Sequence, residues 1–86
     1  MVPLFSARVF VTLKPMVNDP QGITVLEGLK NLGFSAVRDV RVGKLLEISL
    51  EAENEAEASI AVDEMCERLL ANPVIEAYRF DIRPGS

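Results

Sequence analysis

Apolar residues recur at two different spacings along this chain, and the order of these spacings constrains the fold more than any other feature. Every second residue is apolar in "FSARVFVTL", which predicts a half-buried strand over residues 5–13. Spacings of three and four residues follow and predict a helix that begins at Asp19 and Pro20 and ends at Gly33. The first part of the chain is therefore predicted to be a strand followed by a helix.

The middle of the chain, residues 36–51, alternates again. We expect two short strands here, joined by a tight turn at Gly43 and Lys44, because a glycine in the first turn position suits a two-residue hairpin, although other loop lengths remain possible. The second of these strands places three apolar side chains on one face, Leu46, Ile48 and Leu50.

A second helix is the most strongly patterned element of the sequence. Asn54 with Glu57 three residues later is typical of a capping box, and a broad apolar stripe runs from there until the helix stops at Asn72 and Pro73. The alternating run "VIEAYRFDIR" then predicts a final strand.

The predicted order of elements is β-α-β-β-α-β, over one domain of residues 1–86. This order is typical of the α+β ferredoxin-like sandwich, a four-stranded sheet with two helices on one face. The other face would remain open, with Phe10 and Leu45 among charged neighbours. We predict that these two residues form the interface of a homo-oligomer, because such a face is too apolar to remain fully solvated.

Composition excludes several classes of function. Thirteen acidic and nine basic residues give a net charge of −4, which would repel a phosphate backbone, so we expect no binding to nucleic acid. No stretch of the sequence is typical of a signal peptide or a membrane span, so we expect a cytoplasmic protein that does not bind membranes. A chain of 86 residues also leaves little room for a deep active site of its own.

Catalytic and metal-binding groups are scarce. The chain has no histidine, and its one cysteine, Cys66, falls on the apolar stripe of the second helix, where we predict a buried core residue. The carboxylates of "EAENEAEA" crowd the start of a helix, where negative charge complements the helix dipole. We therefore predict neither a catalytic residue nor a metal ligand.

The stretch "LKPMVNDPQG", residues 13–22, is unusual for a short connection. Its two prolines remove hydrogen-bond donors, so it does not resemble a phosphate-binding loop. It can be a rigid crossover that starts the helix, or it can be a contact surface. Gly22 favours a close contact, because glycine inside a helical turn costs about 1 kcal/mol relative to alanine.

Three segments together, "LKPMVNDPQG", "DVRVGKLLEISL" and "MCERLLANPVIEAY", resemble the small PurS subunit of phosphoribosylformylglycinamidine synthase, an enzyme of purine biosynthesis. The resemblance implies a non-catalytic subunit, a dimer or a larger homo-oligomer, that bridges a large synthetase subunit and a glutaminase subunit. It also implies that this chain holds no cofactor, and that ATP, magnesium and glutamine are used by the partner subunits.

The resemblance also implies which residues meet these partners. The first set is Asp19, Pro20, Gln21, Gly22, Arg41, Gly43 and Lys44. A lower-ranked set is Asn72, Pro73, Glu76 and Tyr78, whose members also have ordinary structural uses at a helix stop and in a strand.

Two alternatives come from other proteins that share the β-α-β-β-α-β order. An amino-acid-sensing domain of the ACT kind would be stabilised by a free amino acid. An enzyme of the acylphosphatase kind would need a glycine-rich loop with an arginine after the first strand, which "KPMVNDPQG" lacks.

Overall fold

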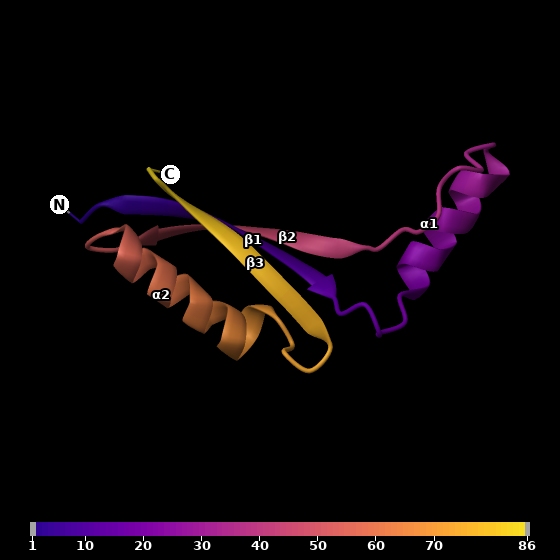
Figure 1. Ribbon diagram of the computed structural model, residues 1–86. Coiled ribbons are helices and arrows are strands. Elements are labelled where there is room, and N and C mark those ends of the chain that lie inside the picture. The colour runs from indigo at the N-terminus through magenta and orange to yellow at the C-terminus, as the bar shows by residue number, and fades with distance from the viewer. Residues whose placement is uncertain (1, 86) are drawn as a thin grey trace.

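The computed structural model describes residues 2–85. Three strands and two helices follow one another in the order β-α-β-α-β (Figure 1). They are β1 (Leu4–Leu13), α1 (Pro20–Asn31), β2 (Gly43–Glu51), α2 (Glu55–Met65), which continues into the π-helical segment η1 (Cys66–Leu70), and β3 (Glu76–Pro84). Among the described residues, no helix is long and apolar enough to cross a membrane.

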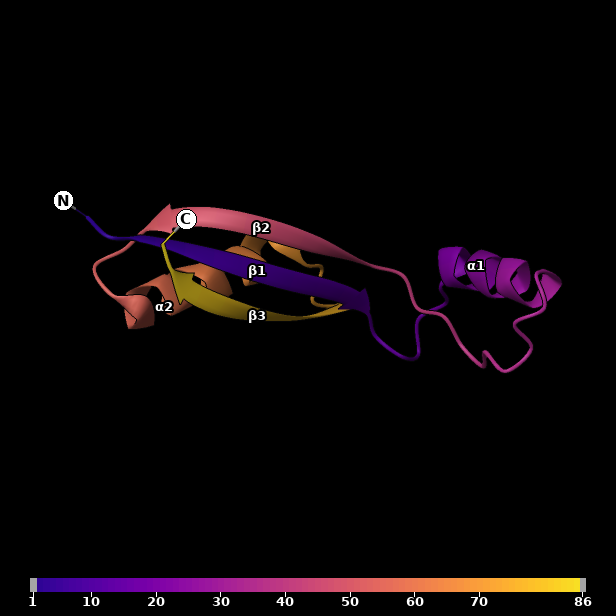
Figure 2. The ribbon, with the colours of Figure 1, turned by 90° about the horizontal axis from the view of Figure 1, so that it is seen from above.

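The three strands form one antiparallel sheet in the order β2-β1-β3, with β1 in the centre (Figure 2). Its register sets Val9 opposite Leu46 on one side and Phe80 on the other. Successive side chains of a strand point to opposite faces, so these three share one face, which we call the inner face. The opposite face, which carries Arg8 and Phe10, is the outer face.

The core lies between the inner face and α2. Val9 and Val11 of β1 and Val62 and Cys66 of the helix are fully buried there. Burying each of these valines contributes about 1.5 to 3 kcal/mol, so this small cluster supplies much of the stability of the sheet and α2. The prediction that Cys66 is a core residue is confirmed.

Local signals for the ends of the helices are also confirmed. The side chain of Asp19 accepts a hydrogen bond from the backbone of Gly22, and Pro20 is the first residue of α1. Asn54 accepts one from Glu57 at the start of α2. After α1, Gly33 has a φ of 100°, which favours glycine because it has no Cβ.

The prediction of a four-stranded ferredoxin-like sheet is wrong, because the sheet has three strands. Residues 36–42 form no strand, and Gly43 and Lys44 begin β2 instead of forming a hairpin turn. A 12-residue helix is about 18 Å long, so the chain needs these residues as an extended return from the far end of α1. Their apolar alternation belongs to a connection that has no neighbouring strand.

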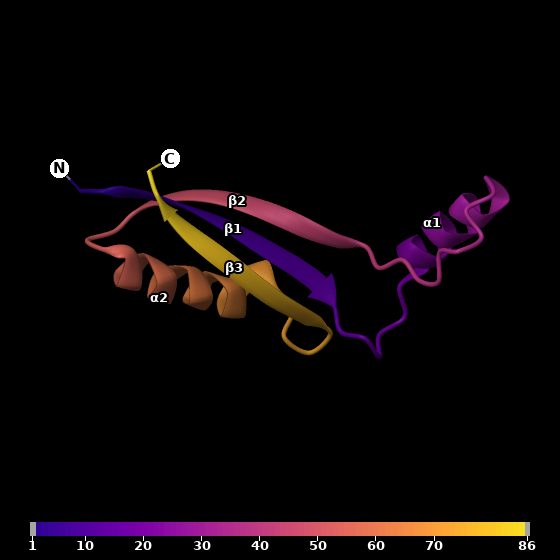
Figure 3. The ribbon, with the colours of Figure 1, turned by 45° about the horizontal axis from the view of Figure 1, so that its top comes forward.

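The two helices also do not share one face of the sheet. Helix α2 lies along the inner face, whereas α1 projects beyond the end of the sheet in all three views (Figures 1, 2 and 3). The chain measures 54 Å along its longest axis, and its radius of gyration is 16.7 Å. A compact domain of this length would have a radius of gyration of about 12 Å. The molecule is therefore elongated, and α1 is not part of the core.

Candidate functional site

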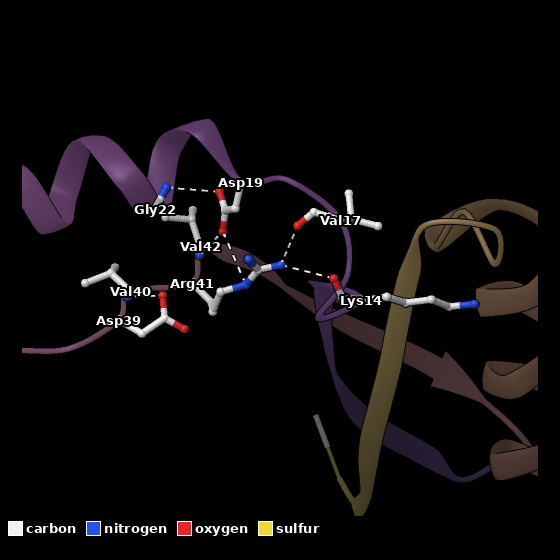
Figure 4. A network of polar contacts seen from close by, with 8 residues as sticks. All are labelled: Lys14, Val17, Asp19, Gly22, Asp39, Val40, Arg41 and Val42. Atoms are coloured by element: carbon white, nitrogen blue, oxygen red, sulfur yellow. Dashed lines mark hydrogen bonds and ion pairs between the residues drawn. The ribbon is translucent and has the colours of Figure 1, made fainter.

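A buried carboxylate holds α1 in its projecting position. Asp19 is the only polar or charged residue that is buried within the described part of the chain. Its Oδ1 accepts a hydrogen bond from the Gly22 backbone N–H at 3.0 Å, and its Oδ2 accepts one from the Val42 N–H at 2.8 Å (Figure 4). One side chain therefore caps α1 and fastens it to the segment that enters β2.

Arg41 extends this network to the connection that follows β1. Its guanidinium donates to the carbonyl oxygens of Lys14 and Val17 at 3.1 and 2.9 Å, and its Nε lies 3.9 Å from Asp19 Oδ2 (Figure 4). We call Asp19, Arg41 and these backbone partners the Asp19 clamp. The clamp joins both chain segments that lead to and from α1.

The hydrogen bonds of the clamp also set the titration of its carboxyl group. The pKa of Asp19 is lowered, mainly by the N–H groups of Val42 and Gly22 and less by the charge of Arg41. Burial acts in the opposite direction but is outweighed. The ionised form of Asp19 is therefore the form that the fold stabilises.

Two glycines allow backbones to approach closely at this end of the molecule. A Cβ at Gly22 would collide with the carbonyl oxygen of Val40, so the close contact suggested by the sequence is made with the chain itself. A Cβ at Gly43 would lie 2.5 Å from the Val11 carbonyl oxygen. Gly43 therefore serves strand pairing between β1 and β2.

Gln21 and Lys44 of the first predicted set line one hollow, whereas Pro20 does not. This hollow has a volume of about 240 Å³ and lies between α1 and the end of the sheet. Its lining includes Asp19, Gln21, Gly43, Lys44 and Glu76. Segments far apart in the sequence thus meet at one end of the sheet. Whether they contact partner subunits stays a prediction.

The loop after η1 is tied to this same end by Lys14. Its Nζ donates to the Pro73 carbonyl oxygen at 2.7 Å, and its backbone N–H donates to that of Ile75 at 2.8 Å. Within the loop, the Glu76 carboxylate accepts from the Asn72 N–H. Asn72, Pro73 and Glu76 thus order the loop. The sequence analysis missed Lys14, and no local pattern singles out a lysine that acts partly through its backbone.

Tyr78 lies on the inner face, under η1. Its hydroxyl lies 2.7 Å from an Asp63 carboxylate oxygen and 2.8 Å from one of Glu67. These hydrogen bonds, first to Asp63 and then to Glu67, raise the pKa of Tyr78 well above its ordinary value. The phenol therefore stays protonated and joins β3 to the helix.

Phe10 and Leu45, which we predicted to form a homo-oligomer interface, are cross-strand neighbours on the outer face. Leu45 is half exposed, and the Arg79 guanidinium lies 4.0 Å from the centre of the Phe10 ring. A role of these residues in a homo-oligomer stays a prediction.

The polar groups of the described residues make structural contacts that hold segments of the chain in place. Burial raises the pKa of the Cys66 thiol, which disfavours the reactive thiolate. No group of histidine, cysteine or acidic side chains within residues 2–85 is arranged to hold a metal ion. The site can fix the direction of a helix and present surfaces to other proteins.

Comparisons with known proteins agree with the resemblance. A model of the PurS family, described as phosphoribosylformylglycinamidine (FGAM) synthase, matches residues 6–84. The PurS subunit of this synthase from Synechocystis is 51% identical over 78 residues, which cover 91% of this chain and 78% of the relative. The corresponding subunit from Bacillus subtilis is 42% identical and covers 92% of this chain and 93% of its own length.

Solved structures are similar over nearly the whole chain. PurS from Thermus thermophilus has a TM-score of 0.86 at 42% identity and covers 98% of this chain and 100% of its own. A chain in the structure of PurLQS from Thermotoga maritima has a TM-score of 0.83 at 36% identity, with coverage of 96% and 99%. These matches give no support to the amino-acid-sensing interpretation. The chain belongs to the PurS family of phosphoribosylformylglycinamidine synthase subunits.

Proposed function

We propose that this chain is a non-catalytic bridge between the synthetase and glutaminase subunits of phosphoribosylformylglycinamidine synthase. Ammonia released from glutamine then converts formylglycinamide ribonucleotide to formylglycinamidine ribonucleotide on the synthetase. The similarity to a chain of PurLQS supports this role. ATP, magnesium and glutamine are used by the partner subunits, and the complex works in the cytoplasm.

The observation that carries the proposal is the projecting helix. Apolar side chains of α1 and the turn after it are 45 to 76% exposed, namely Ile23, Val25, Leu32 and Phe34. So much exposed apolar surface on a small chain is typical of a protein that works in an assembly.

The inner face of the sheet offers a complementary surface. Helix α2 packs against β1 and β3, and the hydrogen bonds of Tyr78 to Asp63 of α2 and Glu67 of η1 mark the side that faces β3. By helical geometry, the opposite side of α2 faces β2 and carries Ala61 and Met65. Half-buried apolar side chains of β2 therefore lie beside this side of α2 on the inner face, namely Leu46, Ile48 and Leu50, and we call them the β2 strip.

A second copy of the chain can cover the β2 strip. The Asp19 clamp directs α1 away from its own sheet, so α1 cannot cover the β2 strip of its own chain. If two copies related by a two-fold axis exchange α1, each α1 covers the β2 strip of the other copy. We propose that the bridging subunit is this homodimer.

Mixing the three subunits tests the bridge. With this chain present, we expect the synthetase and the glutaminase to elute together from a sizing column. Without it, they should elute separately. Co-elution of the two large subunits in its absence would contradict the proposal.

A further inference from the structure

The outer face carries a second feature that the exchanged helix does not explain. Leu45, Phe10 and Arg79 form one row across the three strands. The next row contains Gly43, Thr12 and Ala77, which are small. The step from large to small side chains leaves a hollow of about 420 Å³ that is open to solvent. We call it the Phe10 hollow, after its walls Phe10, Leu45, Ala77 and Arg79.

Arg79 is held in place without a charge partner. Its guanidinium lies 4.0 Å from the centre of the Phe10 ring, where a cation is attracted to the face of the aromatic ring. A guanidinium that stacks in this way keeps N–H groups at its edge for another acceptor. Within residues 2–85, no carboxylate lies within ion-pair distance of Arg79.

The neighbouring arginine on this face behaves differently. Arg8 pairs with Asp81 at 3.0 Å and forms a second hydrogen bond to the same carboxylate. This pair is neutral and satisfied within the chain. Among the described residues Arg83, further along β3, also has no ion pair, but it lies outside the Phe10 hollow. The unpaired charge beside Phe10 and Leu45 is therefore that of Arg79.

We propose that the Phe10 hollow binds a polypeptide segment of the synthetase or glutaminase subunit, one that presents a carboxylate next to an apolar side chain. The carboxylate would accept from the edge of Arg79, and the apolar side chain would cover Phe10 and Leu45. The hollow is open to solvent, whereas small-molecule sites usually enclose most of their ligand, so a protein surface is the better fit. This inference rests on the proposed bridging function.

A second copy of this chain fits the hollow less well. A two-fold axis through Phe10 that runs along β1 would set Leu45 of the other copy opposite Arg79, and one that runs across the strands would set Arg79 there. Neither residue supplies a carboxylate. Charge complementarity therefore favours a different protein.

The test measures the affinity of the full-length chain for each purified partner subunit separately. Arg79→Glu should weaken binding to one of the two subunits by about 30-fold or more, as expected for a central interface residue. Arg83→Glu is the matched control, because Arg83 is an exposed arginine of the same strand and face but lies outside the hollow. It should change that affinity by less than about threefold.

Two further variants separate charge from packing. Arg79→Gln should weaken binding and also reduce its salt dependence, because one charge pair is lost. Phe10→Ala should weaken binding at every salt concentration, because it removes the surface on which Arg79 stacks. Thermal melting and sedimentation of each variant check that the fold and the oligomeric state are retained.

Several results would overturn the assignment. Equal losses in Arg79→Glu and Arg83→Glu would indicate a general charge effect. Loss of self-association in Arg79→Glu, with subunit affinity retained, would identify a second copy as the occupant. If Arg79→Glu binds both subunits as tightly as the wild type does, the proposed role of the Phe10 hollow is refuted and the bridging function is not. If the wild-type chain binds neither subunit, the bridging function is refuted as well.

Discussion

The exchanged helix predicts a specific difference between two neighbouring residues. Leu32, at the end of α1, is 76% exposed, so Leu32→Glu should change the folding of a single chain very little. In a helix-exchanged dimer the same side chain is covered, and Leu32→Glu should weaken the dimer. Asn31→Glu is the control, because it adds the same charge one residue away, on a side of the helix without the apolar stripe.

The size of the effect follows from the exposed surface. Complete burial of a leucine side chain is worth about 1.5 to 3 kcal/mol, so covering the exposed part of Leu32 is worth about 1 to 2 kcal/mol. A two-fold dimer contains this contact twice, which gives about 2 to 4 kcal/mol before the cost of desolvating the new carboxylate. The dissociation constant should therefore rise about 30-fold or more.

Sedimentation equilibrium over a range of concentrations measures this constant directly. We expect wild type and Asn31→Glu to remain dimeric at concentrations where Leu32→Glu dissociates. A monomeric wild type would refute the exchange of helices, and so would equal dissociation constants for the two variants.

Three further variants or conditions test the account of the clamp and the core. Gly22→Ala should lower the melting temperature because its Cβ meets the Val40 carbonyl, whereas Gly28→Ala, which has open space, should raise stability by up to about 1 kcal/mol. Because the pKa of Asp19 is lowered in the folded state, its ionised form stabilises the fold above the unfolded pKa of about 3.9, and this contribution is lost as pH falls through the folded pKa. The Val42 amide, which donates to Asp19, should therefore be less protected from hydrogen exchange in acid, after correction for the intrinsic pH dependence of exchange. In Asp19→Asn this loss of protection in acid should be absent. Native Cys66 should resist thiol reagents that label the unfolded chain, and rapid native labelling would contradict its burial.

Signals that act over a few residues could be predicted from the sequence. Asp19 followed by Pro20 marks the start of α1, and Asn54 marks the start of α2, because a helix cap involves neighbours three residues apart. The strand that became β1 was also predictable, since its alternation is long and is buried on one face only.

Features that depend on distant residues could not be predicted. Alternation in residues 36–42 looks the same in a strand and in an extended connection, and only the position of α1 decides between them. The approach of Gly22 to Val40 is a tertiary contact, so the sequence indicated a close contact but not its partner. We therefore expect Gly22→Ala to perturb folding as well as assembly.

The candidate site shows the same division. The sequence pointed to residues of three segments, and the structure brings Gln21, Lys44 and Glu76 to one hollow. The network of Arg41 with two backbone carbonyls was not predictable, because backbone acceptors leave no mark on the sequence. Tyr78 follows the strand pattern but joins β3 to the helix through its hydroxyl.

By this account the chain catalyses no reaction of its own and connects two catalytic subunits. The most direct test is the rate of formylglycinamidine ribonucleotide formation by the synthetase and glutaminase subunits, with and without this chain, using either glutamine or ammonia as the nitrogen source. We predict that omission of the chain abolishes the glutamine-dependent rate and leaves the ammonia-dependent rate nearly intact. Equal glutamine-dependent rates with and without the chain would contradict the account.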